Sequence, residues 1–180
     1  MDSRAVNGEE VILVNERDEE IGRMEKHAAH REPMLHRAFS IFLFDASGRM
    51  LLQQRAAGKY HSPLLWTNAC CSHPRPGERT EDAAARRLME ELGIHTHLEH
   101  RFAFTYQAEV GNGLTEYELD HVYFGTVTAP PTPNPSEVED WRYVELEALR
   151  EEMTAHPDRF TAWLRICWPM VEEHLSQKRA

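Results

Sequence analysis

The sequence predicts an α/β fold: a single domain in which helices sandwich a mixed β-sheet. The chain has 180 residues, which is about the length of one domain. Hydrophobic residues make up 41% of it, enough to fill a core at this size. Short apolar runs that are typical of strands alternate along the chain with segments of helical periodicity. Strands and helices interleaved around one core favour a mixed α/β architecture.

Apolar runs in the first third of the chain predict three strands. Residues 11–14 are Val-Ile-Leu-Val and are followed by polar and charged residues, which indicates a short strand. Residues 39–44 and 49–55 are two further apolar runs. The sequence Asp-Ala-Ser-Gly at 45–48 is a turn signal between them, so these two strands should form a hairpin.

A long irregular segment and a helix come next. Residues 56–76 are rich in Pro, His and Cys and show no clean period, and a loop of this length in a small domain is usually functional. Thr80 is the predicted N-cap of a helix, because Glu81 and Asp82 follow it in the first turn. Gly93 is the predicted residue just past the end of this helix.

The second half of the chain predicts further strands and two helices. The glycines around Asn112 indicate a turn between two strands, and four prolines indicate a surface loop at 129–135. The expected strands are 101–108, 116–127 and 141–144, and the expected helices are 145–152 and 158–176.

Composition and charge narrow the class of function. The formal net charge of -10 argues against binding to nucleic acid or to an anionic membrane, because both need a basic surface. No apolar run is long enough to span a membrane. Three cysteines without a signal-like N-terminus predict reduced thiols and a cytoplasmic location. Residues 1–8 are expected to form a flexible tail, and 9–180 a single domain.

The 80–93 helix ends on an acidic pair, Glu90 and Glu91. Alone, this pair is explained by a solvated helix face on which Arg87 pairs with Glu91. The surrounding sequence, however, resembles the signature of the Nudix superfamily, a loop–helix–loop that holds divalent cations on a diphosphate. The matching residues are Glu78, Arg86, Leu88, Glu90, Glu91, Gly93 and Ile94. The resemblance implies a Nudix-like mixed sheet.

Two residues depart from the Nudix signature. Ser72 stands in place of its first glycine, and Arg87 in place of a glutamate. The loss of an acidic position to a cation argues against hydrolysis. Arg87 also places positive charge where a diphosphate would lie.

A second motif lies just before this helix. The segment 66–74, Trp-Thr-Asn-Ala-Cys-Cys-Ser-His-Pro, resembles the active loop of the type 1 isopentenyl diphosphate isomerase family. Further blocks similar to that family occur over nearly the whole chain, at 25–30, 35–40, 55–59 and 116–118. The resemblance implies the interconversion of isopentenyl diphosphate and dimethylallyl diphosphate in isoprenoid biosynthesis.

The resemblance also implies two metal sites. One would hold Mn²⁺, Mg²⁺ or Zn²⁺ with five ligands, and Glu116 and Glu118 suit this because side chains two apart on a strand point to one face. The five implied ligands are His30, His36, His73, Glu116 and Glu118. The other site would hold Mg²⁺ at Glu91, bridging the substrate diphosphate and the Cys71 carbonyl.

Acid–base and substrate residues follow from the same resemblance. Cys71 and Glu118 are the implied acid–base pair on opposite sides of the substrate, with Tyr106 beside Glu118 and Trp163 shielding a carbocation. We expect Cys71 to favour its thiolate, since it is near the cations and the metals, and Cys70 to pack in the core. The implied diphosphate-binding cations are Lys26, Arg55, Lys59 and Arg87.

Two other functional classes remain open from the sequence. A Nudix-type diphosphohydrolase would keep Arg86, Glu90 and Glu91 but gives no reason for Cys71 or the histidine set. A non-catalytic Nudix-like binding module could keep the fold, yet it should not keep the cysteine, histidine and glutamate positions together. We therefore expect an isomerase that acts on a small-molecule diphosphate, as a monomer or a homodimer.

Overall fold

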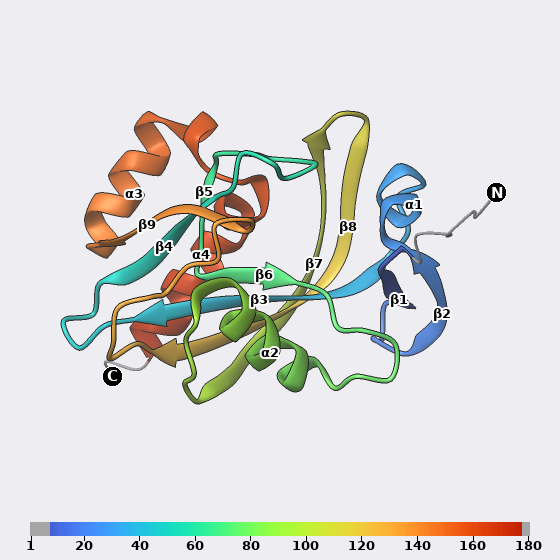
Figure 1. The fold of residues 1–180 in the computed structure, drawn as a ribbon, viewed down its shortest axis with the longest axis horizontal. Helices are drawn as coiled ribbons and strands as arrows, with labels where there is room; N and C mark the ends of the chain where they lie inside the picture. The colour runs from blue at the N-terminus through green and yellow to red at the C-terminus, as the bar shows by residue number, and fades with distance from the viewer. Residues whose placement is uncertain (1–7, 178–180) are drawn as a thin grey trace.

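The computed structural model describes residues 8–177, and in this range nine strands form one sheet with four α-helices beside it (Figure 1). The tail expected over 1–8 lies, apart from Gly8, outside the described residues. No helix within the described part of the chain is long and apolar enough to cross a membrane.

The strands are β1 Glu10–Val14, β2 Glu20–Glu25, β3 His36–Phe44, β4 Met50–Arg55, β5 Trp66–Thr67, β6 Cys70–Ser72, β7 Leu98–Gly111, β8 Leu114–Thr126 and β9 Val138–Val144. The helices are α1 Lys26–Arg31, α2 Thr80–Leu92, α3 Leu146–Ala155 and α4 Ala162–Gln177, with a 3₁₀ turn at Pro157–Arg159.

Strand β3 is the centre of the sheet. It pairs antiparallel with β1, β4 and β6 and parallel with β8, so the sheet is mixed, as predicted. Beyond these neighbours, β7 pairs antiparallel with β8, and β9 with β4. The parallel β3–β8 pair brings His36 opposite Glu118, although they are far apart in sequence.

The register divides the sheet into two faces. Ile41 lies opposite Cys70, and both pack with Leu88 and Leu92 of α2 in one buried cluster. The neighbouring pair, Ser40 and Cys71, points to the opposite face because side chains alternate along a strand. That face is covered by α4, so helices lie on both sides of the sheet (Figure 1). The predicted helix-covered α/β sheet is confirmed.

Helix α2 ends where the sequence predicted but begins one residue earlier. Gly93 adopts φ 63° in the left-handed region, and its N–H donates to the Met89 carbonyl, as expected of a C-terminal glycine. The prediction that Thr80 is the N-cap is wrong. Thr80 is the first helical residue, and Arg79 holds the N-cap position without a side-chain cap.

The elements that the sequence failed to predict are short or lie at an edge. Strand β2 pairs only with β1 and is mostly exposed, so it lacks an apolar pattern. Helix α1 has six residues, and the Glu25 side chain caps it by accepting from two backbone N–H groups. Strands β5 and β6 lie within the segment expected to be a loop, with two and three residues.

Boundaries in the second half also shifted. Strands β7, β8 and β9 begin before the predicted positions. The reason is their pairing, since β7 and β8 pair with each other along most of their length and β9 pairs with β4. The helix expected over 158–176 begins at Ala162, since Pro157–Arg159 form a separate 3₁₀ turn. Helix α3 continues to Ala155, past the predicted end.

Candidate active site

One pocket collects nearly all the residues that the sequence singled out. Its walls come from strands β3, β6, β7 and β8, from the loop between β4 and β5, and from helices α1, α2 and α4. The lining residues are Lys26, Ser40, Arg55, Lys59, Tyr60, His61, Cys71, Ser72, His73, Arg87, Glu91, Tyr106, Glu116, Glu118 and Trp163. Because Cys71, His73 and Glu118 all line it, the face of β3 shared with α4 is the candidate functional face.

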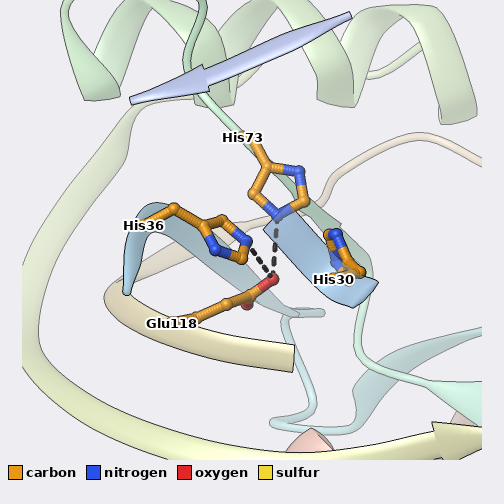
Figure 2. A group of neighbouring side chains, drawn as sticks. All are labelled: His30, His36, His73 and Glu118. Carbon is orange, nitrogen blue, oxygen red and sulfur yellow. Dashed lines mark hydrogen bonds and ion pairs between the residues drawn. The ribbon is translucent and has the colours of Figure 1, made fainter. Parts of the chain in front are cut away.

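A buried histidine–glutamate group lies at one end of the pocket (Figure 2). His30 comes from α1, His36 begins β3, His73 follows β6 and Glu118 lies on β8. Ligand atoms of these four residues are within 4.8 Å of one another. Oε1 of Glu118 is 2.8 Å from Nε2 of His73 and 3.4 Å from Nε2 of His36.

The imidazoles present free nitrogens to this group. Nδ1 of His30 hydrogen-bonds to the Lys26 carbonyl at 2.6 Å, and Nδ1 of His36 to the Met34 carbonyl at 2.7 Å. The buried Nε2 atoms of both rings then have no hydrogen-bond partner within residues 8–177. Burial lowers the pKa of His73 to about 4, so its imidazole is neutral.

This donor set fits a divalent cation. Neutral imidazoles and a carboxylate are ligands for Mn²⁺ or Zn²⁺. A backbone bond on Nδ1 that fixes Nε2 toward the ion is the usual arrangement around metal-binding histidines. The unpartnered Nε2 atoms of His30 and His36 are therefore explained by a metal site.

Glu116, the fifth expected ligand, is not part of this group of four residues with mutually close ligand atoms. Its ligand atom instead lies within 4.8 Å of those of His30 and His61, so two groups overlap at His30. The sequence analysis missed His61. The sequence shows only that His61 lies inside the long irregular segment 56–76, and no family motif marks it.

Tyr106 links the two carboxylates. It lies opposite Glu118 in the β7–β8 ladder, and its hydroxyl hydrogen-bonds to Oε2 of Glu118 at 2.7 Å and of Glu116 at 2.8 Å. Burial, together with the charge of Glu118, raises the pKa of Glu116 well above its usual range. Burial also acts on Glu118, but the imidazoles of His73 and His36 hold its pKa well below the usual range. The pair therefore keeps one proton on the Glu116 side.

Cys71 is surrounded by hydrogen-bonding groups. Its Sγ donates to Oδ1 of Asn68 at 3.2 Å and receives the indole N–H of Trp163 at 3.1 Å. Oγ of Ser40 lies 3.4 Å away and in turn donates to Asp120. Burial and the nearby Asp120 raise the pKa of the Cys71 thiol. The protein groups around Cys71 therefore oppose the expected thiolate, and that expectation stays a prediction that depends on bound metal ions.

Cys70 behaves as the sequence predicted. It is fully buried in the cluster beneath α2, on the face of β6 opposite Cys71.

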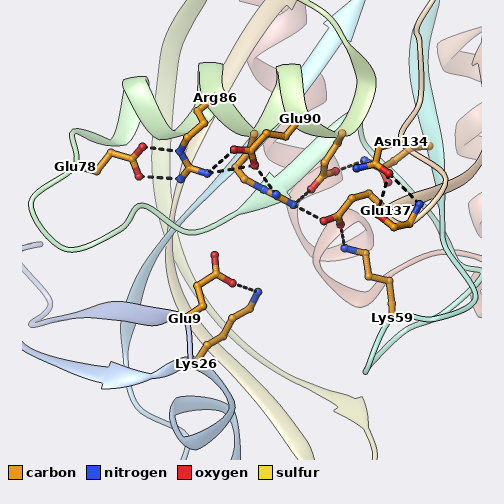
Figure 3. Close-up of polar contacts among 12 residues, drawn as sticks. Glu9, Lys26, Lys59, Glu78, Arg86, Glu90, Asn134 and Glu137 are labelled. Carbon is orange, nitrogen blue, oxygen red and sulfur yellow. Dashed lines mark hydrogen bonds and ion pairs between the residues drawn. The ribbon is translucent and has the colours of Figure 1, made fainter. Parts of the chain in front are cut away.

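The expected diphosphate-binding cations are all at the pocket, and three of them have carboxylate partners (Figure 3). Lys26 pairs with Glu9 at 3.1 Å, and Lys59 pairs with Glu137. Arg87 pairs with Glu137 at 3.2 Å and also with acidic residues of its own helix.

Arg55 differs from the other cations. Its guanidinium donates to the carbonyls of His61 and Ser62, both at 3.1 Å, and lies over the Trp163 ring with a distance of 5.1 Å to the centroid. It thus shapes the loop and the indole position as well as adding positive charge.

Only one of the Nudix-type acidic residues lines this pocket. Glu91 is 4% exposed, accepts from Nε2 of Gln53 at 2.8 Å and pairs with Arg87 at 2.6 Å. Glu78 forms a two-armed pair with Arg86, which also contacts Glu90 (Figure 3). These two carboxylates are held outside the pocket.

Comparison with known proteins gives consistent matches. The model of the NUDIX domain family matches residues 34–164. The chain is 52% identical to isopentenyl-diphosphate Delta-isomerase 1 of Aromatoleum aromaticum over 88% of this chain and 90% of the relative. It is 49% identical to isopentenyl-diphosphate Delta-isomerase of Serratia proteamaculans over 86% of this chain and 87% of the relative.

Solved structures match at the level of the fold. A crystal structure from Deinococcus radiodurans aligns with a TM-score of 0.69 at 23% identity, covering 82% of this chain and 90% of that one. The MutT protein of Methanosarcina mazei aligns with a TM-score of 0.63 at 17% identity, covering 81% and 96%.

Proposed function

Since the chain belongs to the isopentenyl-diphosphate Delta-isomerases of the Nudix superfamily, we propose that its reaction takes place in the pocket between Cys71 and Glu118. The enzyme interconverts isopentenyl diphosphate and dimethylallyl diphosphate. The observation that carries the site assignment is the joint placement of Cys71 with the Tyr106–Glu118 pair, on strands either side of β3.

The reaction itself requires two opposed proton-transfer groups. An unactivated C=C bond gains a proton at its terminal carbon, which leaves a tertiary carbocation on the neighbouring carbon. A C–H bond on the far side of that carbon then breaks, its electron pair forms the new C=C bond, and a base takes the proton. One proton enters and one leaves, so substrate and product have the same composition.

Strands β6 and β8 supply the two groups. In the direction from isopentenyl to dimethylallyl diphosphate, we assign proton donation to Glu118 and Tyr106 and proton removal to Sγ of Cys71. Glu116 belongs to the same hydrogen-bonded group, because the Tyr106 hydroxyl also hydrogen-bonds to its Oε2. This direction starts from a Cys71 thiolate and a proton on the Tyr106–Glu118 side. After one turnover Cys71 is a thiol and Glu118 a carboxylate, and exchange with solvent returns a proton to the Glu118 side and removes one from Cys71 before the next turnover. The reverse reaction starts from that state.

Trp163 is assigned to protect the carbocation. Its indole N–H donates to Cys71, so the ring is held beside the reacting carbons, and it is only 3% exposed. An aromatic face near a desolvated cation contributes about 2 kcal/mol. The same buried wall keeps water from capturing the cation, which would otherwise give an alcohol.

Metal ions complete the proposed site. His30, His36 and His73 with Glu116 and Glu118 would hold Mn²⁺, Mg²⁺ or Zn²⁺, and a bound ion would supply the charge that orients the Glu118 carboxyl and tunes its acidity. Glu91 and the Cys71 carbonyl would hold Mg²⁺ beside the diphosphate. Lys26, Arg55, Lys59 and Arg87 supply the positive charge that an anionic substrate needs in this acidic chain.

Product analysis tests this assignment. Purified protein is incubated with Mg²⁺, Mn²⁺ and isopentenyl diphosphate, and the products are separated. We expect dimethylallyl diphosphate without phosphate release, because Glu78 and Glu90 are paired outside the pocket. Phosphate release without an allylic product would support a diphosphohydrolase instead and would overturn the proposal.

The remaining proposals concern the setting of the enzyme. We propose that residues 9–180 act as one isomerase domain in the cytoplasm, as a monomer or a homodimer. The three cysteines are all free, which agrees with a reducing compartment.

A further inference from the structure

His61 is a buried residue of the pocket to which the proposed function gives no role. Ligand atoms of His61, His30 and Glu116 lie within 4.8 Å of one another. This group shares His30 with the group of His36, His73 and Glu118 (Figure 2). The two groups are therefore adjacent, and His61 extends the cluster on the side of Glu116.

The position of His61 is fixed through its backbone. The Arg55 guanidinium donates to the carbonyls of His61 and Ser62, and Ser62 adopts φ 48° in the left-handed region. A serine holds this backbone conformation only where its surroundings enforce it. The His61 side chain is 4% exposed, so the turn directs a buried imidazole into the pocket.

The ring of His61 presents Nε2 to the acidic side of the cluster. This atom is 3.4 Å from Oε1 of Glu116, which is long for a direct hydrogen bond but suits two ligands of one ion. Nδ1 is 3.3 Å from Oγ of Ser62 on the other side of the ring. The ring centroid of His30 is 5.8 Å away, and Nε2 of His30 has no hydrogen-bond partner among the described residues.

Ligand distances explain why His61 belongs with Glu116. Two ligands of one ion lie at most about 4.4 Å apart when each bond is about 2.2 Å. Glu116 is absent from the mutual group formed by His30, His36, His73 and Glu118. His61 meets this limit, with Nε2 3.4 Å from Oε1 of Glu116, and His30 completes a group whose ligand atoms lie within 4.8 Å of one another. The imidazole of His61 thus supplies a donor on the Glu116 side of the cluster.

We propose that His61 is an additional metal ligand, which binds a divalent transition-metal ion through Nε2 together with Glu116 and His30. The proposal rests on the metal site of the proposed function and adds a fourth imidazole to it. Imidazole favours transition metals, whereas carboxylate and water favour Mg²⁺. His61 should therefore raise the preference of the site for Co²⁺, Mn²⁺ or Zn²⁺ over Mg²⁺.

Titration of the metal-free full-length protein with Co²⁺ tests the proposal. The variants are His61→Asn and, as a matched control, His27→Asn. The His27 ring lies 4.4 Å from that of Tyr60 yet belongs to neither ligand group. We expect His61→Asn to weaken Co²⁺ binding about tenfold or more and to shift the visible absorption of bound Co²⁺. His27→Asn should leave both unchanged.

An unchanged Co²⁺ affinity and spectrum in folded His61→Asn would overturn the proposal. If His61→Asn does not fold, His61→Asp is measured, and an oxygen ligand there should shift the Co²⁺ spectrum and favour Mn²⁺, whereas an unchanged spectrum would again overturn it. The result is separate from the proposed function, because Co²⁺ binding needs no substrate. A wild-type protein that binds Co²⁺ through His61 but forms no dimethylallyl diphosphate would contradict only the proposed function.

Discussion

At the scale of single residues, the neighbours Cys70 and Cys71 show how a strand separates structure from chemistry. They have the same side chain and lie next to each other on β6, yet one packs beneath α2 and the other lines the pocket. The cause is the alternation of side chains along an extended chain. Opposite faces of one short strand thus line the core and the pocket.

Replacing each cysteine by alanine should separate the two roles. Cys70→Ala removes a small buried group and should cost roughly 1 kcal/mol of stability, with activity within a few fold of wild type. Cys71→Ala should fold normally and lose about 100-fold or more of kcat, because it removes a proton-transfer group. Isomerase assays and thermal unfolding of both variants measure this. Equal losses of activity would refute the assignment of Cys71.

Burial and then Asp120 raise the pKa of the Cys71 thiol. Burial and the charge of Glu118 raise the pKa of Asp120 itself. We expect Asp120→Asn to lower the pKa of Cys71, because the variant removes the nearby negative charge. The measurement is the rate at which iodoacetamide alkylates Cys71 as a function of pH, with Cys70→Ala as the background. With Asp120→Asn added, this rate should begin to rise at a lower pH. An unshifted profile would show that Asp120 has no influence.

Asp120 also makes stability depend on pH with a defined sign. Its pKa is higher in the folded protein than the ordinary value of about 3.9 in the unfolded chain. The folded state therefore holds a proton that the unfolded state has lost, so this group's contribution to stability falls as pH rises from about 4 toward the folded pKa. As pH rises over that range, the unfolding free energy of Asp120→Asn, measured with urea, should fall less than that of the wild-type protein.

At the scale of elements, the end of α2 and the proline-rich segment after β8 form one unit. The Thr132 N–H donates to the Leu92 carbonyl, and the Asn134 N–H donates to the Glu91 carbonyl, both at 2.8 Å. These carbonyls lack partners within the helix, so the segment serves as its C-terminal cap. The cap helps to position Glu91 at the pocket.

Gly93 is the residue on which this junction depends. Its φ is 63°, and an added Cβ would lie 3.1 Å from both Cβ and the carbonyl oxygen of Thr132. We expect Gly93→Ala to destabilise the protein by about 1–3 kcal/mol, from backbone strain and displacement of the segment. Gly58→Ala is the control, because Gly58 has no positive φ and no atom within 4 Å of an added Cβ. Similar unfolding free energies for the two variants would contradict this account.

Glu137, at the end of the same segment, pairs with two of the cations that we propose bind the diphosphate, Lys59 and Arg87. Glu137→Gln should bind inorganic pyrophosphate about fivefold more tightly, if a partly buried pair is worth about 1 kcal/mol. Glu139→Gln, an exposed carboxylate on β9, is the control. Calorimetric titration measures both, and weaker binding in Glu137→Gln would mean that the carboxylate takes part in the site.

At the scale of the whole molecule, the sequence predicted the helix-covered mixed sheet and most of the pocket. Periodicity placed the long buried strands and α2, and the family resemblance marked residues that β3 and its neighbours bring together. Periodicity could not find β2, whose exposed side chains follow no apolar pattern. His61 was missed because its role depends on a turn enforced by Arg55, which no local pattern reveals.

The same scale explains why the protein groups around Cys71 oppose the expected thiolate. Nearness in sequence to cations suggested a low pKa, but the fold places Asp120 and Glu118 on the same sheet face. The cations Lys59 and Arg87 already have carboxylate partners. The charge around Cys71 therefore depends on how β3, β6 and β8 pair. This pairing joins residues far apart in sequence, so no local pattern predicts it.

The central claim is that two separate groups, on β6 and β8, transfer the two protons. The most direct measurement is isomerisation of isopentenyl diphosphate in D₂O, with the deuterium content of dimethylallyl diphosphate measured after a single turnover. The account predicts deuterium in the newly formed methyl group, because the donated proton comes from the solvent-exchanged Tyr106–Glu118 side while Cys71 keeps the proton removed from the substrate. Product without deuterium would mean that one group removes and returns the same proton, and would contradict the account.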